Sequence, residues 1–95
     1  MAKFENMKTN STYHELLLDE RWGSKRQHIL ERDNFRCRNC FGKEDLQIHH
    51  RQYHVWRETG NMVLPWEYKD DLLIALCKKC HQIGHEKYKI PYFEV

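Results

Sequence analysis

Two cysteine pairs bracket a histidine pair in this chain, and this order constrains the fold more than any other feature of the sequence. Cys37 and Cys40 form the first C-x2-C pair, and Cys77 and Cys80 form the second. A C-x2-C turn directs two sulfurs at one ion, and zinc in structural sites takes four ligands arranged as a tetrahedron. The four cysteines therefore predict one closed zinc site that joins the N-terminal half of the chain to the C-terminal half.

The size and composition of the chain fit one small globular domain. Its 95 residues are 40% hydrophobic and 32% charged, and at this size a metal often supplements a small hydrophobic core. No apolar run approaches the roughly 20 residues that cross a bilayer, and residues 1–10 lack a signal-peptide core. We expect a flexible N-terminal arm over residues 1–10, one domain over residues 11–95, a cytoplasmic location and no membrane partner. In a reducing compartment the cysteines are expected to be thiolates on zinc rather than disulfides.

Two helices are predicted before the first cysteine pair. Ser11 or Thr12 caps a short helix, because Thr12 and Glu15 have the spacing of a capping box. Asp19 then caps a second helix over about residues 20–33, in which three apolar side chains recur on one face. These apolar residues are Trp22, Ile29 and Leu30.

The histidines lie on predicted strands and on a helix. We expect a short strand around Leu46 and Ile48, a loop of about twenty residues, a second strand around residues 73–76, and then a helix that begins near Cys77 or Lys78. On this helix His81 and His85 are four residues apart and share one face, so they can hold a single ion. The alternative is a pair of surface histidines.

The adjacent His49 and His50 are harder to place, because neighbours in a regular strand point to opposite faces of the sheet. A site that uses both requires the strand to end or to bulge there. The alternative is that one of these histidines is buried in the core and the other is exposed.

Basic residues gather near the first cysteine pair and the histidine pair, although the net charge of the chain is only +2. Arg36 and Arg38 flank Cys37, and Arg51 follows His50 directly. A basic face of this kind can neutralise several phosphates of a nucleic acid, and we expect these arginines to contact DNA. An ordinary solvated surface with mixed charge is the alternative.

The ordered motif Cys37-x2-Cys40, Leu46-Gln47-Ile48-His49-His50, Leu76-Cys77-x2-Cys80-His81 resembles the HNH endonucleases of the ββα-metal (His-Me finger) fold, in the subgroup with a four-cysteine zinc. The stretch from Arg21 to Phe35 and the segment Pro65-Trp66-Glu67-Tyr68 are similar to small bacterial and phage HNH proteins. The resemblance extends over about residues 13–88. It implies an α+β fold with N-terminal helices. It also implies hydrolysis of DNA phosphodiesters to 5′-phosphate and 3′-hydroxyl ends, in a bacterial or phage-infected host cell.

The resemblance also implies a role for each histidine. His50 would be the general base that activates water, and His49, His81 and His85 would bind a catalytic divalent cation. This cation would be Mg²⁺ or another ion such as Mn²⁺, Ni²⁺ or Zn²⁺, and three imidazoles suit the latter ions better than Mg²⁺.

One departure from the family pattern concerns the central asparagine, whose position falls on Leu72. Leucine neither binds a metal nor forms a side-chain hydrogen bond, so either another group braces the loop or the site is weakened. Candidates are Asp70, Asp71 and Asn61, or the packing of Trp66 and Tyr68.

Two other functions remain open at the level of sequence. The first is a catalytically silent, zinc-stabilised module that binds nucleic acid. The second is a protein-interaction module whose docking surface is aromatic, although core packing is the default role for such residues. Those aromatic residues are Trp56, Trp66, Tyr68, Tyr92 and Phe93. For an enzyme of this size we expect either loose cutting or a protein partner that provides targeting, and the sequence does not determine the oligomeric state.

Overall fold

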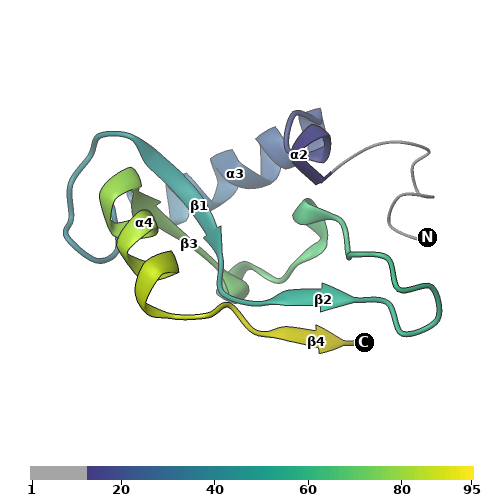
Figure 1. Cartoon of the computed structure of the whole chain (residues 1–95). Coiled ribbons are helices and arrows are strands. Elements are labelled where there is room, and N and C mark those ends of the chain that lie inside the picture. The colour runs from purple at the N-terminus through teal and green to yellow at the C-terminus, as the bar shows by residue number, and fades with distance from the viewer. Residues whose placement is uncertain (1–12) are drawn as a thin grey trace.

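The centre of the fold is an antiparallel pair of strands, β1 (Leu46–His50) and β3 (Leu73–Cys77), in the computed structural model, which describes residues 13–95 (Figure 1). Leu46 lies opposite Cys77 at one end of the pair, and His50 lies opposite Leu73 at the other. Because side chains alternate along a strand, Ile48 and His50 share one face of β1, while Gln47 and His49 share the other.

Helix α3 (Glu20–Arg32) packs on the first of these faces, and helix α4 (Lys78–Lys87) packs on the second (Figure 1). The core lies mainly between α3 and the strand pair. It contains Ile48, Leu73 and Ala75 from the strands and the three predicted apolar residues of α3, all of them buried. The prediction of a helix over residues 20–33 with one apolar face is confirmed.

Helix α3 begins where the sequence predicts. The side chain of Asp19 accepts a hydrogen bond from the Arg21 backbone N–H at 2.8 Å, which satisfies a donor of the first turn. A short helix α2 (Tyr13–Leu16) precedes it. The predicted caps Ser11 and Thr12 and the predicted arm over residues 1–10 lie outside the described residues.

A second sheet was not predicted. Strand β2 (Tyr53–Val55) follows β1 almost directly and pairs in parallel with β4 (Tyr92–Glu94), so that Tyr53 lies opposite Tyr92. Figure 1 shows this pair running away from the β1–β3 pair to the C-terminus. Each strand has only three residues, which is too few to produce a hydrophobic pattern that sequence periodicity can detect.

The segment that leads back to β3 contains two 3-10 turns, η1 (Pro65–Glu67) and η2 (Asp70–Leu72). It is braced by Asp70, the first of the candidates for this task. The Asp70 carboxylate accepts hydrogen bonds from Lys25 Nζ and from His28 Nε2, both at 2.7 Å, and Arg32 donates to its carbonyl oxygen at 2.6 Å. All three partners come from α3, so Asp70 ties the loop to this helix.

The loop aromatics divide between the core and the surface. Tyr68 is buried, and Trp66 is half-buried beneath the guanidinium of Arg21, 4.4 Å from its ring centroid. Tyr68 and Trp66 therefore pack against the core, which is the usual role of aromatic residues in a small domain. The other three residues of the suggested docking surface, Trp56, Tyr92 and Phe93, are exposed.

The described residues thus form a small α+β fold with short sheets and a cluster of four cysteines. Among the helices of residues 13–95, none combines the length and the apolar character needed to cross a membrane.

Candidate metal centres

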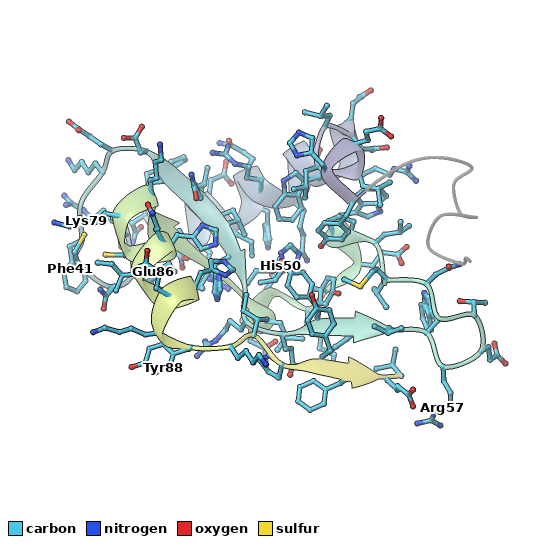
Figure 2. The ribbon with its side chains drawn as sticks, in the orientation of Figure 1. Phe41, His50, Arg57, Lys79, Glu86 and Tyr88 are labelled. Carbon is cyan, nitrogen blue, oxygen red and sulfur yellow. The ribbon has the colours of Figure 1, made fainter. Side chains whose placement is uncertain are left out.

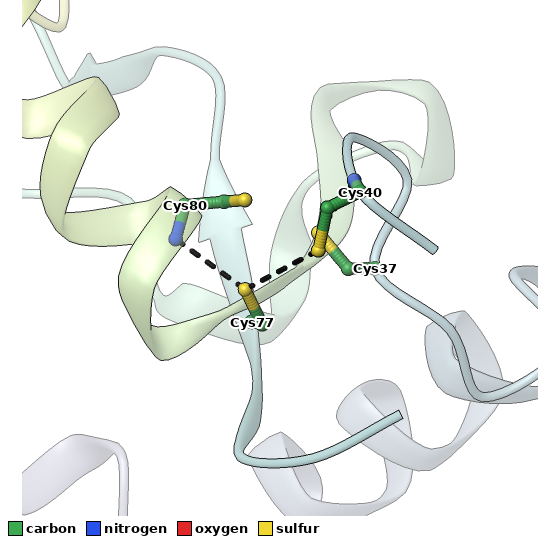
Figure 3. Close-up of side chains that lie close together, drawn as sticks. All are labelled: Cys37, Cys40, Cys77 and Cys80. Carbon is green, nitrogen blue, oxygen red and sulfur yellow. Dashed lines mark hydrogen bonds between the residues drawn. The ribbon is translucent and has the colours of Figure 1, made fainter. Parts of the chain in front are cut away.

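The four cysteines converge at one end of the β1–β3 pair, where they form the cysteine cluster (Figure 3). All four are free thiols whose sulfur atoms lie within 4.8 Å of one another. The Sγ atoms of Cys40 and Cys77 are 3.7 Å apart, close to the edge of about 3.8 Å that a zinc tetrahedron with 2.3 Å Zn–S bonds requires. The prediction that the two pairs meet is confirmed, and the cluster is compatible with a structural zinc ion.

Backbone amides already point at these sulfurs. The N–H groups of Asn39 and Cys40 lie 3.4 Å from Cys37 Sγ, and the N–H of Cys80 lies 3.4 Å from Cys77 Sγ. Burial raises the pKa of the Cys37 thiol, but these hydrogen bonds outweigh burial and hold its pKa below the usual range. Cys37 therefore favours the thiolate, which is the form that zinc binds. A hydrogen bond from Asn39 lowers the pKa of Cys80, but hydrogen bonds with the other cysteines and burial outweigh it and raise this pKa to about 11.

A buried carboxylate links the cysteine cluster to the rest of the fold. Asp33 ends α3, and its side chain accepts hydrogen bonds from Arg32, from Arg38 and from the backbone N–H of Ala75. Arg38 lies within the first cysteine pair, and its own N–H donates to the Ala75 carbonyl at 2.9 Å. Asp33 thus connects α3, the first cysteine pair and β3.

His49, His81 and His85 form a second group, the histidine cluster, in which one ligand atom of each residue lies within 4.8 Å of the others. His81 Nε2 and His85 Nε2 are 2.9 Å apart. Two nitrogens about 2.1 Å from one ion are separated by about 3.0 Å in an octahedral site and about 3.4 Å in a tetrahedral one. The spacing therefore suits shared coordination, and His49 comes from β1 while the other two come from α4.

The state of these imidazoles also suits a cation. Gln47 Oε1 lies 2.6 Å from His81 Nδ1 and can only accept, so the hydrogen of His81 resides on Nδ1 and Nε2 carries the lone pair. Nδ1 of His49 is buried and has no hydrogen-bond partner within the described part of the chain, and a buried polar atom without a partner is unfavourable. The residues present thus fit a divalent cation.

Burial keeps His49 and His81 of this cluster neutral. It lowers the pKa of His49 to about 4, with further lowering from the neighbouring His81 and His85. The pKa of His81 is lowered for the same two reasons, burial first and His85 second. At neutral pH both rings are therefore unprotonated, which metal binding requires.

His50 is placed differently from the other histidines. It is the last residue of β1, so the strand ends at the histidine pair, and it is buried while His49 is half-buried. Its Nε2 lies 3.1 Å from the carbonyl oxygen of Pro65. A carbonyl accepts only, so Nε2 carries the hydrogen and Nδ1 keeps the lone pair. Burial lowers the pKa of His50 and so favours the neutral ring, and the Pro65 bond offsets this lowering only in part.

One cavity brings His50 together with the histidine cluster. This inner cavity of about 270 Å³ is lined by His50, His81 and His85, and also by Gln47 and Arg26. Figure 2 shows His50 at the centre of the molecule, where the two sheets meet. The three histidines thus line a common space that is large enough for a water molecule.

The predicted arginines do not all lie together. A groove of about 640 Å³, the basic groove, is lined by Arg38, Arg51, Lys87 and His49 among other residues, and none of its lining residues within residues 13–95 is acidic. Arg36 lies outside this groove, and its guanidinium donates to the Phe41 carbonyl at 3.2 Å. A role for Arg36 in DNA binding remains a sequence-based prediction.

Sequence reasoning missed Gln47, Asp33 and Lys87. For Gln47 a signal was present, since strand alternation places it on the same face as His49, two residues away. Asp33 and Lys87 gave no comparable signal, because their partners or neighbours lie far away along the chain.

Comparison of the chain with protein-family models, with curated proteins and with solved structures finds no match. Functional inference therefore depends on the geometry described above.

Proposed function

We propose that this protein is a metal-dependent DNA endonuclease of the HNH class, with the ββα-metal arrangement formed by β1, β3 and α4. The observation that carries the proposal is the inner cavity, which His50 lines together with two members of a three-imidazole cluster, while the Nε2 atom of His50 is engaged by the Pro65 carbonyl. A general base beside a metal site is the arrangement that hydrolysis of a phosphodiester needs.

In the proposed mechanism each residue has one task. The Nδ1 atom of His50 accepts a proton from the attacking water, while the Pro65 carbonyl holds the ring in the required tautomer. His49, His81 and His85 hold a divalent cation, which when bound would stabilise negative charge on the phosphate and on the leaving oxygen. Gln47 orients His81 for this task. Three imidazoles favour Mn²⁺, Ni²⁺ or Zn²⁺ over Mg²⁺.

The basic groove supports DNA as the substrate. Arg51 and Lys87 line this groove together with His49. Arg38 lies in the same groove and is half exposed while it pairs with Asp33 at 2.8 Å. The contacts available here are charge contacts to phosphates, so we expect binding with little sequence preference.

The test is incubation of supercoiled plasmid with zinc-loaded protein in the presence of Mg²⁺, Mn²⁺, Ni²⁺ or additional Zn²⁺. We expect nicking with at least one cation and loss of nicking in His49→Ala. The matched control is His14→Ala, which removes an exposed imidazole on α2 and should leave nicking unchanged. Absence of nicking with every cation, together with retained DNA binding, would instead indicate the catalytically silent nucleic-acid-binding module.

A further inference from the structure

A stack of four aromatic rings runs from the core of the protein to its surface. Trp22 stacks on His50 with ring centroids 5.2 Å apart, His50 on Tyr53 at 5.2 Å, and Tyr53 on Tyr92 at 5.4 Å, with interplanar angles of 19°, 23° and 29°. These distances lie in the range of offset-stacked rings. Trp22 is buried, whereas Tyr92 is 63% exposed. The stack therefore ends in a ring that is largely open to solvent.

The outer end of this stack forms a wall of a large hollow on the described structure. This hollow, the aromatic groove, has a volume of about 990 Å³, at the upper end of the range for ligand sites. The aromatic and charged side chains that line it include Tyr13, Tyr53, Tyr88, Tyr92, His85 and Lys89. Its surface is mainly aromatic and aliphatic, with one cation, and no acidic residue within the described chain lines it.

The aromatic groove continues from the sites already described. His85 belongs both to the histidine cluster and to the lining of this groove. Tyr88, which follows α4 and is labelled in Figure 2, lines both the basic groove and the aromatic groove. A polynucleotide strand with one phosphate at the histidine cluster would therefore have the aromatic groove beside its next nucleotide.

We propose that the aromatic groove binds an unpaired nucleobase of the strand whose phosphate lies at the histidine cluster, so that the protein selects nucleic acid with unstacked or single-stranded nucleotides. The proposal rests on the proposed function, because it places that phosphate at the cluster. A base has a π-face that can extend the stack beyond Tyr92, and Lys89 can neutralise a flanking phosphate. A base inside a duplex is already stacked and cannot reach the groove.

The test compares two DNA probes, a fully paired duplex and the same duplex with a single-stranded tail, by fluorescence anisotropy. Zinc-loaded protein is used without any other divalent cation, so that binding is measured without cutting. We expect wild-type protein to bind the tailed duplex more tightly. Tyr92→Leu should lower affinity for the tailed duplex by about 5- to 150-fold, the usual effect of one stacking ring, without changing affinity for the paired duplex.

Phe93→Leu is the matched control, since Phe93 is the next residue of β4, is similarly exposed and contacts His54 rather than the groove. It should bind both probes like wild type. Tyr92→Trp keeps a stacking surface and should retain the preference for the tail. Thermal melting of each variant confirms that it is folded.

Two results would overturn the proposal. Equal affinity of wild-type protein for both probes means that no base is bound in the groove. Equal loss in Tyr92→Leu and Phe93→Leu, or no loss in either, means that the groove serves another occupant, such as a protein partner or a second copy of this chain. Nicking without a preference for the tail would refute this inference alone, whereas a preference for the tail without nicking would refute only the nuclease.

Discussion

Replacement of Asp33 by asparagine is a direct test of how the fold supports its metal centres. The Asp33 side chain is 1% exposed, and its two oxygens accept four hydrogen bonds. Arg32 donates two, at 2.8 and 2.9 Å, Arg38 donates one at 2.8 Å, and the Ala75 backbone N–H donates one at 2.9 Å. Asparagine has nearly the same shape but carries no charge.

The expected loss of stability in Asp33→Asn follows from the pKa of the Asp33 carboxyl group. Burial raises the pKa of Asp33, but the hydrogen bonds from Arg32, Ala75 and Arg38 more than offset burial and lower the pKa from 3.8 to about 2. This difference corresponds to about 2 kcal/mol in favour of the folded, charged state. Asp33→Asn should therefore lower the free energy of unfolding by about 2 kcal/mol, and the Tm by about 8–16 °C for a domain of this size.

The assay is thermal and urea unfolding of zinc-loaded protein, with Asp71→Asn as the control. Asp71 is an exposed aspartate on η2, so the control variant should stay within about 0.5 kcal/mol of wild type. Because folding lowers the pKa of Asp33, its contribution is fully present above about pH 4 and is lost as the pH falls towards 2. The difference between wild type and Asp33→Asn should hence be constant between pH 5.5 and 8. A difference below about 0.5 kcal/mol, or one that changes across this interval, would refute the reasoning.

The remaining predictions concern the candidate metal clusters and the proposed DNA contacts. Cys77→Ser leaves three zinc ligands, and circular dichroism should show that this variant is largely unfolded. The reason is that apparent zinc-binding energies of order 10 kcal/mol match the whole stability of a small domain. A cooperative, native-like thermal transition of the zinc-free variant would contradict this prediction. His50→Ala should keep the fold, zinc and DNA affinity but slow nicking by about 10²- to 10⁴-fold. The nicking defect of His81→Ala should instead be partly relieved by a higher concentration of the catalytic cation. If that cation restored nicking equally in both variants, His50 would not be a base distinct from the metal ligands. Arg51→Ala should lower the slope of log DNA affinity against log salt concentration by about one. Arg36 lies outside the basic groove, so Arg36→Ala should change this slope less. Salt titrations in which Arg36→Ala lowers the slope more than Arg51→Ala would contradict this prediction.

The sequence predicted the cysteine cluster and the main helix correctly because both signals are local. A C-x2-C turn sets the positions of two sulfurs by itself, and the spacing of Trp22, Ile29 and Leu30 follows from the helical repeat. The i, i+4 spacing likewise placed His81 and His85 together. The meeting of His49 with these two residues was expected only through the resemblance, and the geometry now brings the three together.

Contacts between segments far apart in the chain could not be predicted from the sequence. Asp33 gives no sign in the sequence that it will receive the N–H of Ala75, 42 residues away, and β2 pairs with β4 across most of the C-terminal half of the chain. The loop after β1 was expected to be irregular for about twenty residues, but β2 begins only three residues after His50. Parallel pairing of two three-residue strands depends on packing that neither strand encodes alone.

The cysteine and histidine clusters share helix α4, so an ion bound at one would affect the geometry of the other. Cys77 caps α4, its sulfur accepting from the Cys80 N–H, so a cysteine of the candidate zinc site also fixes where the helix starts. His81 follows Cys80 directly and points about 100° away around the helix axis, towards Gln47 and His49 on β1. Zinc bound at the cysteine cluster would therefore hold His81 in register with the other two histidines. If zinc raises the affinity of the histidine cluster for a divalent cation, that cation must raise the affinity for zinc by the same factor, which competition with a chelator at equilibrium would measure.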